Sequence, residues 1–189
     1  MITVEVAQRD VRSTFLGGFA GQLVSGVLWL ASAALGTWGT RRSAILALVV
    51  GGVFIFPLTQ LVLRAMGRGA ALEPGNPLGQ LARQVAFTVP LSLPLVAAAT
   101  LYRPNWFYPS FMLVIGTHYL PFMFLYGMNM FGVLAGVLIA GAVLIGLYAS
   151  SSFALGGWVT GAVLVMFAFI GRALAAETRH AGDAARESR

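Results

Sequence analysis

The sequence predicts an all-α integral membrane protein, a bundle of six transmembrane helices with both termini in the cytoplasm. The first observation behind this prediction is composition: of 189 residues, 58% are hydrophobic and 10% are charged, and the mean hydropathy is +0.83. Soluble domains carry about 25% charged residues, and six acids with twelve bases cannot cover a water-soluble protein of this length. The second observation is a series of six apolar runs, each close to the roughly 20 residues that a helix needs to cross a bilayer.

The six apolar runs contain no Asp or Glu and are separated by short connections and by one longer loop. They divide the chain into a cytoplasmic N-terminal segment (1–13), a transmembrane domain (14–172) and a polar cytoplasmic tail (173–189). The predicted spans are 14–36, 43–65, 81–101, 106–126, 129–149 and 152–172.

The distribution of arginine predicts the orientation, because cytoplasmic loops of membrane proteins carry an excess of positive charge. All twelve bases are Arg, and with both termini inside nine of them lie on the cytoplasmic side. The outer side then holds Arg41, Arg42 and Arg103, and the adjacent pair does not fit the rule. The absence of Lys and the abundance of Ala and Gly are typical of GC-rich bacterial genomes, so we expect the bacterial cytoplasmic (inner) membrane.

Several classes of site are excluded or disfavoured by residue content. The chain has no cysteine, which excludes disulfides, thiolate chemistry and iron–sulfur clusters. The arginines lie at the ends of apolar runs and do not form a nucleic-acid-binding patch, so we expect membrane lipids as partners and no nucleic acid. His118 is the only histidine within a predicted span, and His180 lies in the tail, so we expect no metal and no cofactor.

Polar residues within two predicted spans recur at helical spacing. In the first span one face carries Gly18, Gln22, Ser25, Trp29 and Ser32, and in the third Gln80, Gln84, Thr88 and Ser92 follow every four residues. Polar side chains in hydrocarbon need partners, which predicts that these faces turn inward. Two interpretations stay open: interhelical hydrogen bonds that hold the bundle together, or a polar pocket along the bundle axis.

His118 lies near the middle of the fourth span among phenylalanines at helical spacing. Pro121, three residues on, leaves the carbonyl of Thr117 without its helical donor. Such an imidazole is either a neutral, hydrogen-bonded structural residue or a contact for a ligand, and a proton switch belongs to the second interpretation. We predict no catalytic residues. The candidate ligand-binding residues are His118, Thr117, Gln22, Gln84 and Thr88.

Two short segments resemble elements of a known group. Gly75-Asn76-Pro77-Leu78-Gly79 and Ile115-Gly116-Thr117-His118-Tyr119-Leu120-Pro121-Phe122 are similar to an Asn-Pro-Leu helix start and a Gly-x-His-x-Leu-Pro-aromatic element. Both occur in a group of small bacterial multi-pass membrane proteins known only as a domain of unknown function. The resemblance implies a membrane protein of about six helices and supplies no mechanism. Independently, Asn76 before Pro77 predicts the N-cap of the third span.

Small residues four apart predict close helix contacts. We expect these contacts to lie within one molecule, and a homodimer face is the alternative. The pairs are Gly17 and Gly21, Gly132 and Gly136 (followed by Ala140), and Gly157 and Gly161.

Three functions of different classes fit these patterns. The first is a transporter-like bundle that binds or passes a small or lipid-like ligand, motivated by the polar faces, the prolines within spans and His118. The second is an accessory subunit without catalysis, which fits the glycine seams. The third is a membrane enzyme for an apolar substrate, which lacks the two cooperating groups that acid–base chemistry needs. The sequence favours the first.

Overall fold

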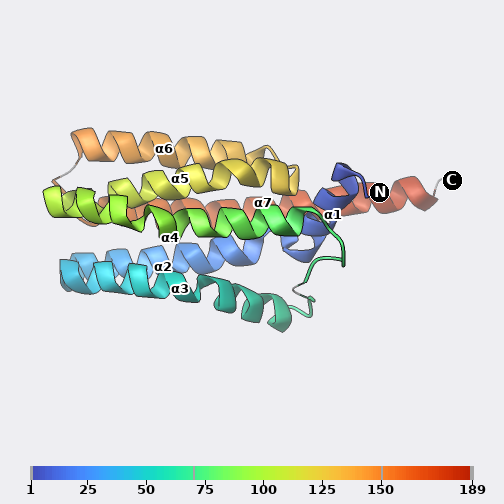
Figure 1. Cartoon of the computed structure of the whole chain (residues 1–189), viewed down its shortest axis with the longest axis horizontal. Helices are drawn as coiled ribbons and strands as arrows, with labels where there is room; N and C mark the ends of the chain where they lie inside the picture. The colour runs from blue at the N-terminus through green and yellow to red at the C-terminus, as the bar shows by residue number, and fades with distance from the viewer. Residues whose placement is uncertain (1, 70, 150, 188–189) are drawn as a thin grey trace.

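All regular secondary structure in the described part of the chain is helical. The computed structural model describes residues 2–69, 71–149 and 151–187, with side chains as far as residue 177. Helices α2 to α7 lie side by side along one axis, and the short α1 lies at the end where α7 finishes (Figure 1). The elements are α1 (Val4–Thr14), η1 (Leu16–Gly18), α2 (Phe19–Trp38), α3 (Arg41–Ala65), α4 (Leu78–Tyr102), η2 (Pro104–Trp106), α5 (Phe107–Tyr126), α6 (Met130–Tyr148) and α7 (Leu155–Glu187).

Five helices in the described residues are long and apolar enough to cross a membrane, and they coincide with five of the six predicted spans. They are Leu16–Trp38, Arg41–Ala65, Leu78–Tyr102, Met130–Tyr148 and Leu155–Glu177. The remaining predicted span, 106–126, corresponds to α5, whose tyrosines, prolines and His118 lower its hydropathy.

The position of α5 explains its mixed composition. It packs against α4 on one side and α6 on the other, and half of its residues are buried. A helix enclosed by protein needs a narrower apolar surface than one that faces lipid. By contrast, α3 packs mainly on α2 and α4 mainly on α5, and their outer faces expose large apolar side chains such as Phe56 and Leu91.

Helices α2 and α7 pack against each other through small residues. A Cβ atom at Gly26 of α2 would lie 3.0 Å from the carbonyl oxygen of Gly161, and one at Gly161 of α7 would lie 2.9 Å from the backbone nitrogen of Leu30. Gly157 similarly faces Ala33, at 2.9 Å. The Gly157–Gly161 seam therefore brings two helices together within one molecule, whereas Gly136 of α6 has no heavy atom within 4 Å of its Cβ position.

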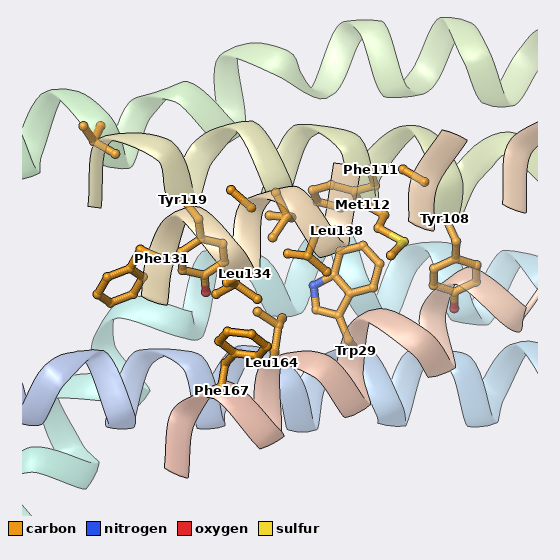
Figure 2. Close-up of a cluster of buried hydrophobic side chains, with 14 of the residues drawn as sticks. Trp29, Tyr108, Phe111, Met112, Tyr119, Phe131, Leu134, Leu138, Leu164 and Phe167 are labelled. Carbon is orange, nitrogen blue, oxygen red and sulfur yellow. The ribbon is translucent and has the colours of Figure 1, made fainter. Parts of the chain in front are cut away.

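Large side chains of α2, α5, α6 and α7 fill the space between these helices (Figure 2). Trp29 of α2 is 1% exposed, and its ring centroid lies 5.2 Å from that of Phe111. Farther along the axis, Tyr119 stacks on Phe131 with centroids 6.1 Å apart. These rings occupy the interior along much of the bundle.

A buried pair of hydroxyl groups satisfies polar atoms within this interior. Ser32 donates to the carbonyl of Ala44 at 2.8 Å, and its oxygen lies 2.6 Å from the Tyr108 hydroxyl. Because Ser32 has one proton and gives it to Ala44, the Tyr108 hydroxyl is the donor to Ser32. The prediction that the polar face of the first span turns inward is confirmed, since Gln22, Ser25 and Ser32 are buried.

The N-terminal region contains a helix that the sequence analysis did not predict, and α2 begins at Phe19, later than the predicted span start at residue 14. Residues 4–14 form α1, and the chain then turns through Leu16, Gly17 and Gly18, all with positive φ. Gly17 also approaches the backbone of Gly171 too closely for any side chain. The break places α2 at Phe19, and Gly17 and Gly21 therefore do not form the continuous helical seam expected from their spacing.

Helix α1 is an amphipathic segment that caps the end of α5. Gln8 donates to the carbonyl of Phe124 at 2.5 Å, and Arg12 donates to the carbonyl of Tyr126 at 2.6 Å. The last carbonyls of a helix lack partners within the helix, and a cation is favoured there. Burial lowers the pKa of Arg12, with the neighbouring Arg9 adding to the effect, yet an arginine stays charged at neutral pH.

Asn76 ties the loop before α4 to α1. Its side-chain oxygen accepts from the Leu78 nitrogen at 2.9 Å, so Asn76 bonds the first backbone N–H of α4, although the N-cap position is Pro77, one residue later than predicted. Its amide nitrogen donates to Asp10 at 2.7 Å and to the carbonyl of Ala7 at 3.1 Å. The Asn-Pro-Leu element thus has a structural role at the end of the bundle.

The polar face of α4 does not turn inward, contrary to the expectation. Gln80, Gln84 and Thr88 are exposed, and Ser92 is half-buried. The reason is the peripheral place of α4, which has one main neighbour, α5, and leaves most of its circumference outside. Spacing along the sequence identifies a shared face but does not say which neighbour covers it.

We expect Gly161→Ala to lower the free energy of unfolding by about 1–3 kcal/mol, because the added methyl group forces α2 and α7 apart. Gly136→Ala is the matched control, since its Cβ position is open. Unfolding by SDS in mixed micelles measures the free energy of unfolding of both variants. Equal loss in the two variants would contradict the packing described here.

Candidate functional site

His118 of α5 is held against α4 by a hydrogen bond. Its Nδ1 atom lies 2.9 Å from the Thr88 hydroxyl oxygen. Phe122, one turn on, lies beside the imidazole with ring centroids 5.1 Å apart, and Tyr119 lies beside it at 5.7 Å. The imidazole is therefore fixed between an α4 hydroxyl and an aromatic cluster (Tyr119, Phe122, Tyr126 and Phe131) whose rings contact one another.

Counting protons at Thr88 assigns the tautomer of His118. The Thr88 hydroxyl donates its single proton to the carbonyl of Val85 at 2.7 Å. It can then only accept from His118, so the neutral imidazole carries its proton on Nδ1. The imidazole also makes a hydrogen bond with the Val85 backbone. With Nδ1 as the donor to both Thr88 and Val85, the Nε2 atom keeps a free lone pair.

A hollow of about 190 Å³ lies beside this imidazole, between α4 and α5. Both Thr88 and Thr117 are exposed, so the hollow opens to the outer surface of the bundle. On the inner side, the aromatic cluster closes it. The lining residues are Thr88, Ser92, Val114, Thr117, His118 and Pro121.

The hydroxyl groups around the hollow have already given their protons to their own helices. Ser92 donates to the carbonyl of Thr88 at 2.7 Å, and Thr117 donates to the carbonyl of Val114 at 2.9 Å. Pro121 has no N–H group and leaves the Thr117 carbonyl without its usual helical donor. The hollow thus presents hydrogen-bond acceptors, carries no full charge while His118 is neutral, and offers no free donor among its described lining residues.

The structure brings together three of the five predicted site residues, His118, Thr117 and Thr88. Gln84 lies one turn before Thr88 on α4, is exposed and does not line the hollow. Ser92 and Pro121 line it and were not among the predicted ligand-binding residues; the four-residue spacing from Thr88 to Ser92 was the available signal for the first.

Gln22 occupies a different place, in the interior. It is 2% exposed and lies between Gly18, which contacts Phe131 of α6, and Gly26, which contacts α7. Neither its amide nitrogen nor its amide oxygen has a hydrogen-bond partner in the described structure. A buried amide without partners costs about 1–3 kcal/mol. Gln22 is thus a buried polar residue of α2 outside the lining of the His118 hollow.

Within the described residues, no three His, Asp or Glu side chains gather so as to hold a metal ion. The side chain of His180, the second histidine, lies outside the described residues.

A bundle with five apolar helices of membrane-spanning length defines a membrane-embedded protein. The chain belongs to a family of unknown function, DUF7010, which matches it over residues 4–173. The expectation of an uncharacterised family is confirmed, and the match includes both α1 and the hollow. No curated protein and no solved structure matches the chain.

Proposed function

We propose that this protein binds a lipid-like molecule carrying a hydroxyl group, at the hollow beside His118. The single observation that supports this proposal is that the hollow presents hydrogen-bond acceptors and no free donors, and opens on the outer surface of an apolar bundle. A hydroxyl group is the complement of such a site, because it can donate to His118 Nε2 or to the Thr117 carbonyl. An anion has no donor to meet there.

The size and position of the hollow favour an amphiphile over a water-soluble ligand. About 190 Å³ accommodates a small polar group with a few carbons, and the rest of a chain would lie along exposed apolar side chains of α4 such as Leu91 and Leu95. A molecule dissolved in the bilayer reaches this site from the side, without passing through the bundle.

Binding fits the site better than passage or catalysis. The aromatic cluster fills the interior behind His118, which argues against a path along the bundle axis. His118 is the one titratable side chain that lines the hollow, whereas acid–base chemistry needs two groups in reach of the substrate.

We also propose that α5 crosses the bilayer, which gives six spans in the bacterial inner membrane with both termini in the cytoplasm. Its 20 residues suffice for a span. It runs alongside α4 and α6 for its whole length (Figure 1). The arginine distribution supports cytoplasmic termini.

Because the chain has no cysteine, single-cysteine labelling tests this topology without background. Pro104→Cys and Asn129→Cys lie at exposed positions on opposite ends of α5. We expect a membrane-impermeant maleimide added to intact inner-membrane spheroplasts to label the first and not the second. Labelling of both from the same side would contradict a spanning α5.

The ligand proposal is tested with oleyl alcohol and its methyl ether, which differ only in the hydroxyl proton. We expect the wild-type protein in mild detergent to bind the alcohol about tenfold more tightly, the effect of one hydrogen bond of roughly 1.4 kcal/mol, as counted by native mass spectrometry. His118→Phe keeps an aromatic ring and removes the Nε2 acceptor, so it should reduce the preference to what the Thr117 carbonyl alone supplies.

Thr100→Val is the matched control, because Thr100 also lies on α4 and donates only to its own helix, at the Val96 carbonyl. It should keep the preference for the alcohol. Equal binding of alcohol and ether by the wild-type protein would overturn the proposal. The alternative of an accessory subunit, in which His118 only joins α4 to α5, would then be favoured.

A further inference from the structure

A second hollow lies at the opposite end of the bundle, where α3 begins and where α4 connects through η2 to α5. Its volume is about 300 Å³, and it is separate from the His118 site in both place and chemistry. The residues that line it are Arg41, Tyr102, Arg103, Pro104, Asn105 and Trp106. Two arginines that are 62 positions apart in the sequence thus face one space.

Aromatic rings hold both guanidinium groups in position. The Arg103 guanidinium lies 5.7 Å from the ring centroid of Tyr102 and 5.3 Å from that of Trp106. The Arg41 guanidinium lies 5.5 Å from the ring centroid of Phe153. Contact with a ring face leaves the N–H groups at the edge of each guanidinium free to bind an acceptor.

No carboxylate among the described side chains neutralises these arginines. The chain has no Asp or Glu between residues 74 and 176, and its acids lie in α1, in the loop before α4 and in the last part of the chain. In the described structure the one ion pair joins Arg9 to Glu5, at the other end. Arg41 and Arg103 therefore carry two uncompensated positive charges into one hollow.

Helix stability does not account for Arg41. It occupies the first position of α3, where the helix dipole disfavours a cation. The positive-inside rule does not account for it either, since it belongs to the end with fewer arginines. An anion that binds between Arg41 and Arg103 would neutralise the charge that is unfavourable both at the start of α3 and at this end of the bundle.

The aromatic residues around this end place the hollow at the depth of lipid headgroups. Trp38 is 78% exposed, Tyr102 73% and Tyr148 82%, and Trp and Tyr are enriched at membrane–water interfaces. Trp106 adds a further donor, because its indole Nε1 is buried and has no partner among the described residues. The hollow thus combines two fixed cations with an indole N–H at the interface.

We propose that this hollow binds a phosphate group, supplied by the headgroup of an anionic phospholipid of the leaflet at this end of the bundle. Phosphate oxygens accept charge-assisted hydrogen bonds from arginine, often as bidentate pairs. The proposal is independent of the function assigned to the His118 hollow. Free inorganic phosphate has the same recognition chemistry, and the experiment separates the two sources.

The experiment compares binding of dioleoylphosphatidylglycerol and dioleoylphosphatidylcholine to the full chain in neutral detergent, by native mass spectrometry. Both lipids carry a phosphate, but the choline cation of the second opposes binding beside two arginines. The double variant Arg41→Gln/Arg103→Gln tests the site. Arg42→Gln is the matched control, because it removes the same charge from the next residue of α3, which does not line the hollow. We expect the wild type and Arg42→Gln to prefer phosphatidylglycerol about tenfold and the double variant to lose the preference.

Arg103→Lys keeps the charge and loses the planar fork, so it should keep only part of the preference, and circular dichroism checks that each variant is folded. A competition with sodium phosphate against sodium chloride at equal ionic strength identifies the source. If sodium phosphate displaces the lipid, free phosphate is the ligand. If the lipid stays bound, the phospholipid headgroup is the ligand. Equal binding of both lipids by the wild type, or an equal loss in Arg42→Gln, would overturn the proposal.

Discussion

The absence of water from the hydrocarbon core is the constraint on which this structure depends, because every polar group there must find its partner in the chain. Most side-chain hydroxyls meet this requirement locally. Thr59 donates to Ile55, Thr100 to Val96 and Thr160 to Gly156, each to a carbonyl of the preceding turn. Ser32 and Tyr108 bond across helices as a buried pair, in which Tyr108 donates to Ser32 and Ser32 donates to the Ala44 carbonyl.

The same constraint explains how the bundle ends. The final carbonyls of α5 would have no partner at the bundle end, and α1 supplies Gln8 and Arg12 to meet them. Asp10 on the same helix accepts from Asn76 and from the backbone nitrogen of Glu73, which fixes the loop that leads into α4. Helix α1 thus joins α5 to the start of α4, the two helices that form the His118 hollow.

Three places in the described structure carry polar groups without a partner, and two of them are hollows that can bind a ligand. At the His118 hollow the unused groups are acceptors, whereas at the Arg41–Arg103 hollow they are donors with positive charge. One site therefore complements a hydroxyl group within the bilayer and the other a phosphate at its surface. Gln22 is a third case, an interior amide without partners that belongs to neither hollow.

Hydropathy predicted most of the fold, because a helix that crosses the hydrocarbon core needs a continuous apolar run of about 20 residues, which is visible in the sequence. It could not predict α1, since these eleven amphipathic residues acquire their role only from the α5 carbonyls and the loop before α4 that they bond. His118 could be identified as the one imidazole in an apolar span, and Thr117 and Thr88 were also among the predicted residues. The sequence could not separate Gln22 and Gln84 from them, because helical spacing defines a face and not the neighbouring helix that meets it.

The measurement that tests the central claim most directly is the ¹⁵N chemical shift of His118 in bilayers, by solid-state NMR on histidine-labelled protein. His180→Asn removes the second histidine signal. The proton count at Thr88 predicts a neutral imidazole with the proton on Nδ1 and a bare Nε2 facing the hollow. A proton on Nε2, or on both nitrogens at neutral pH, would contradict an acceptor site at this position.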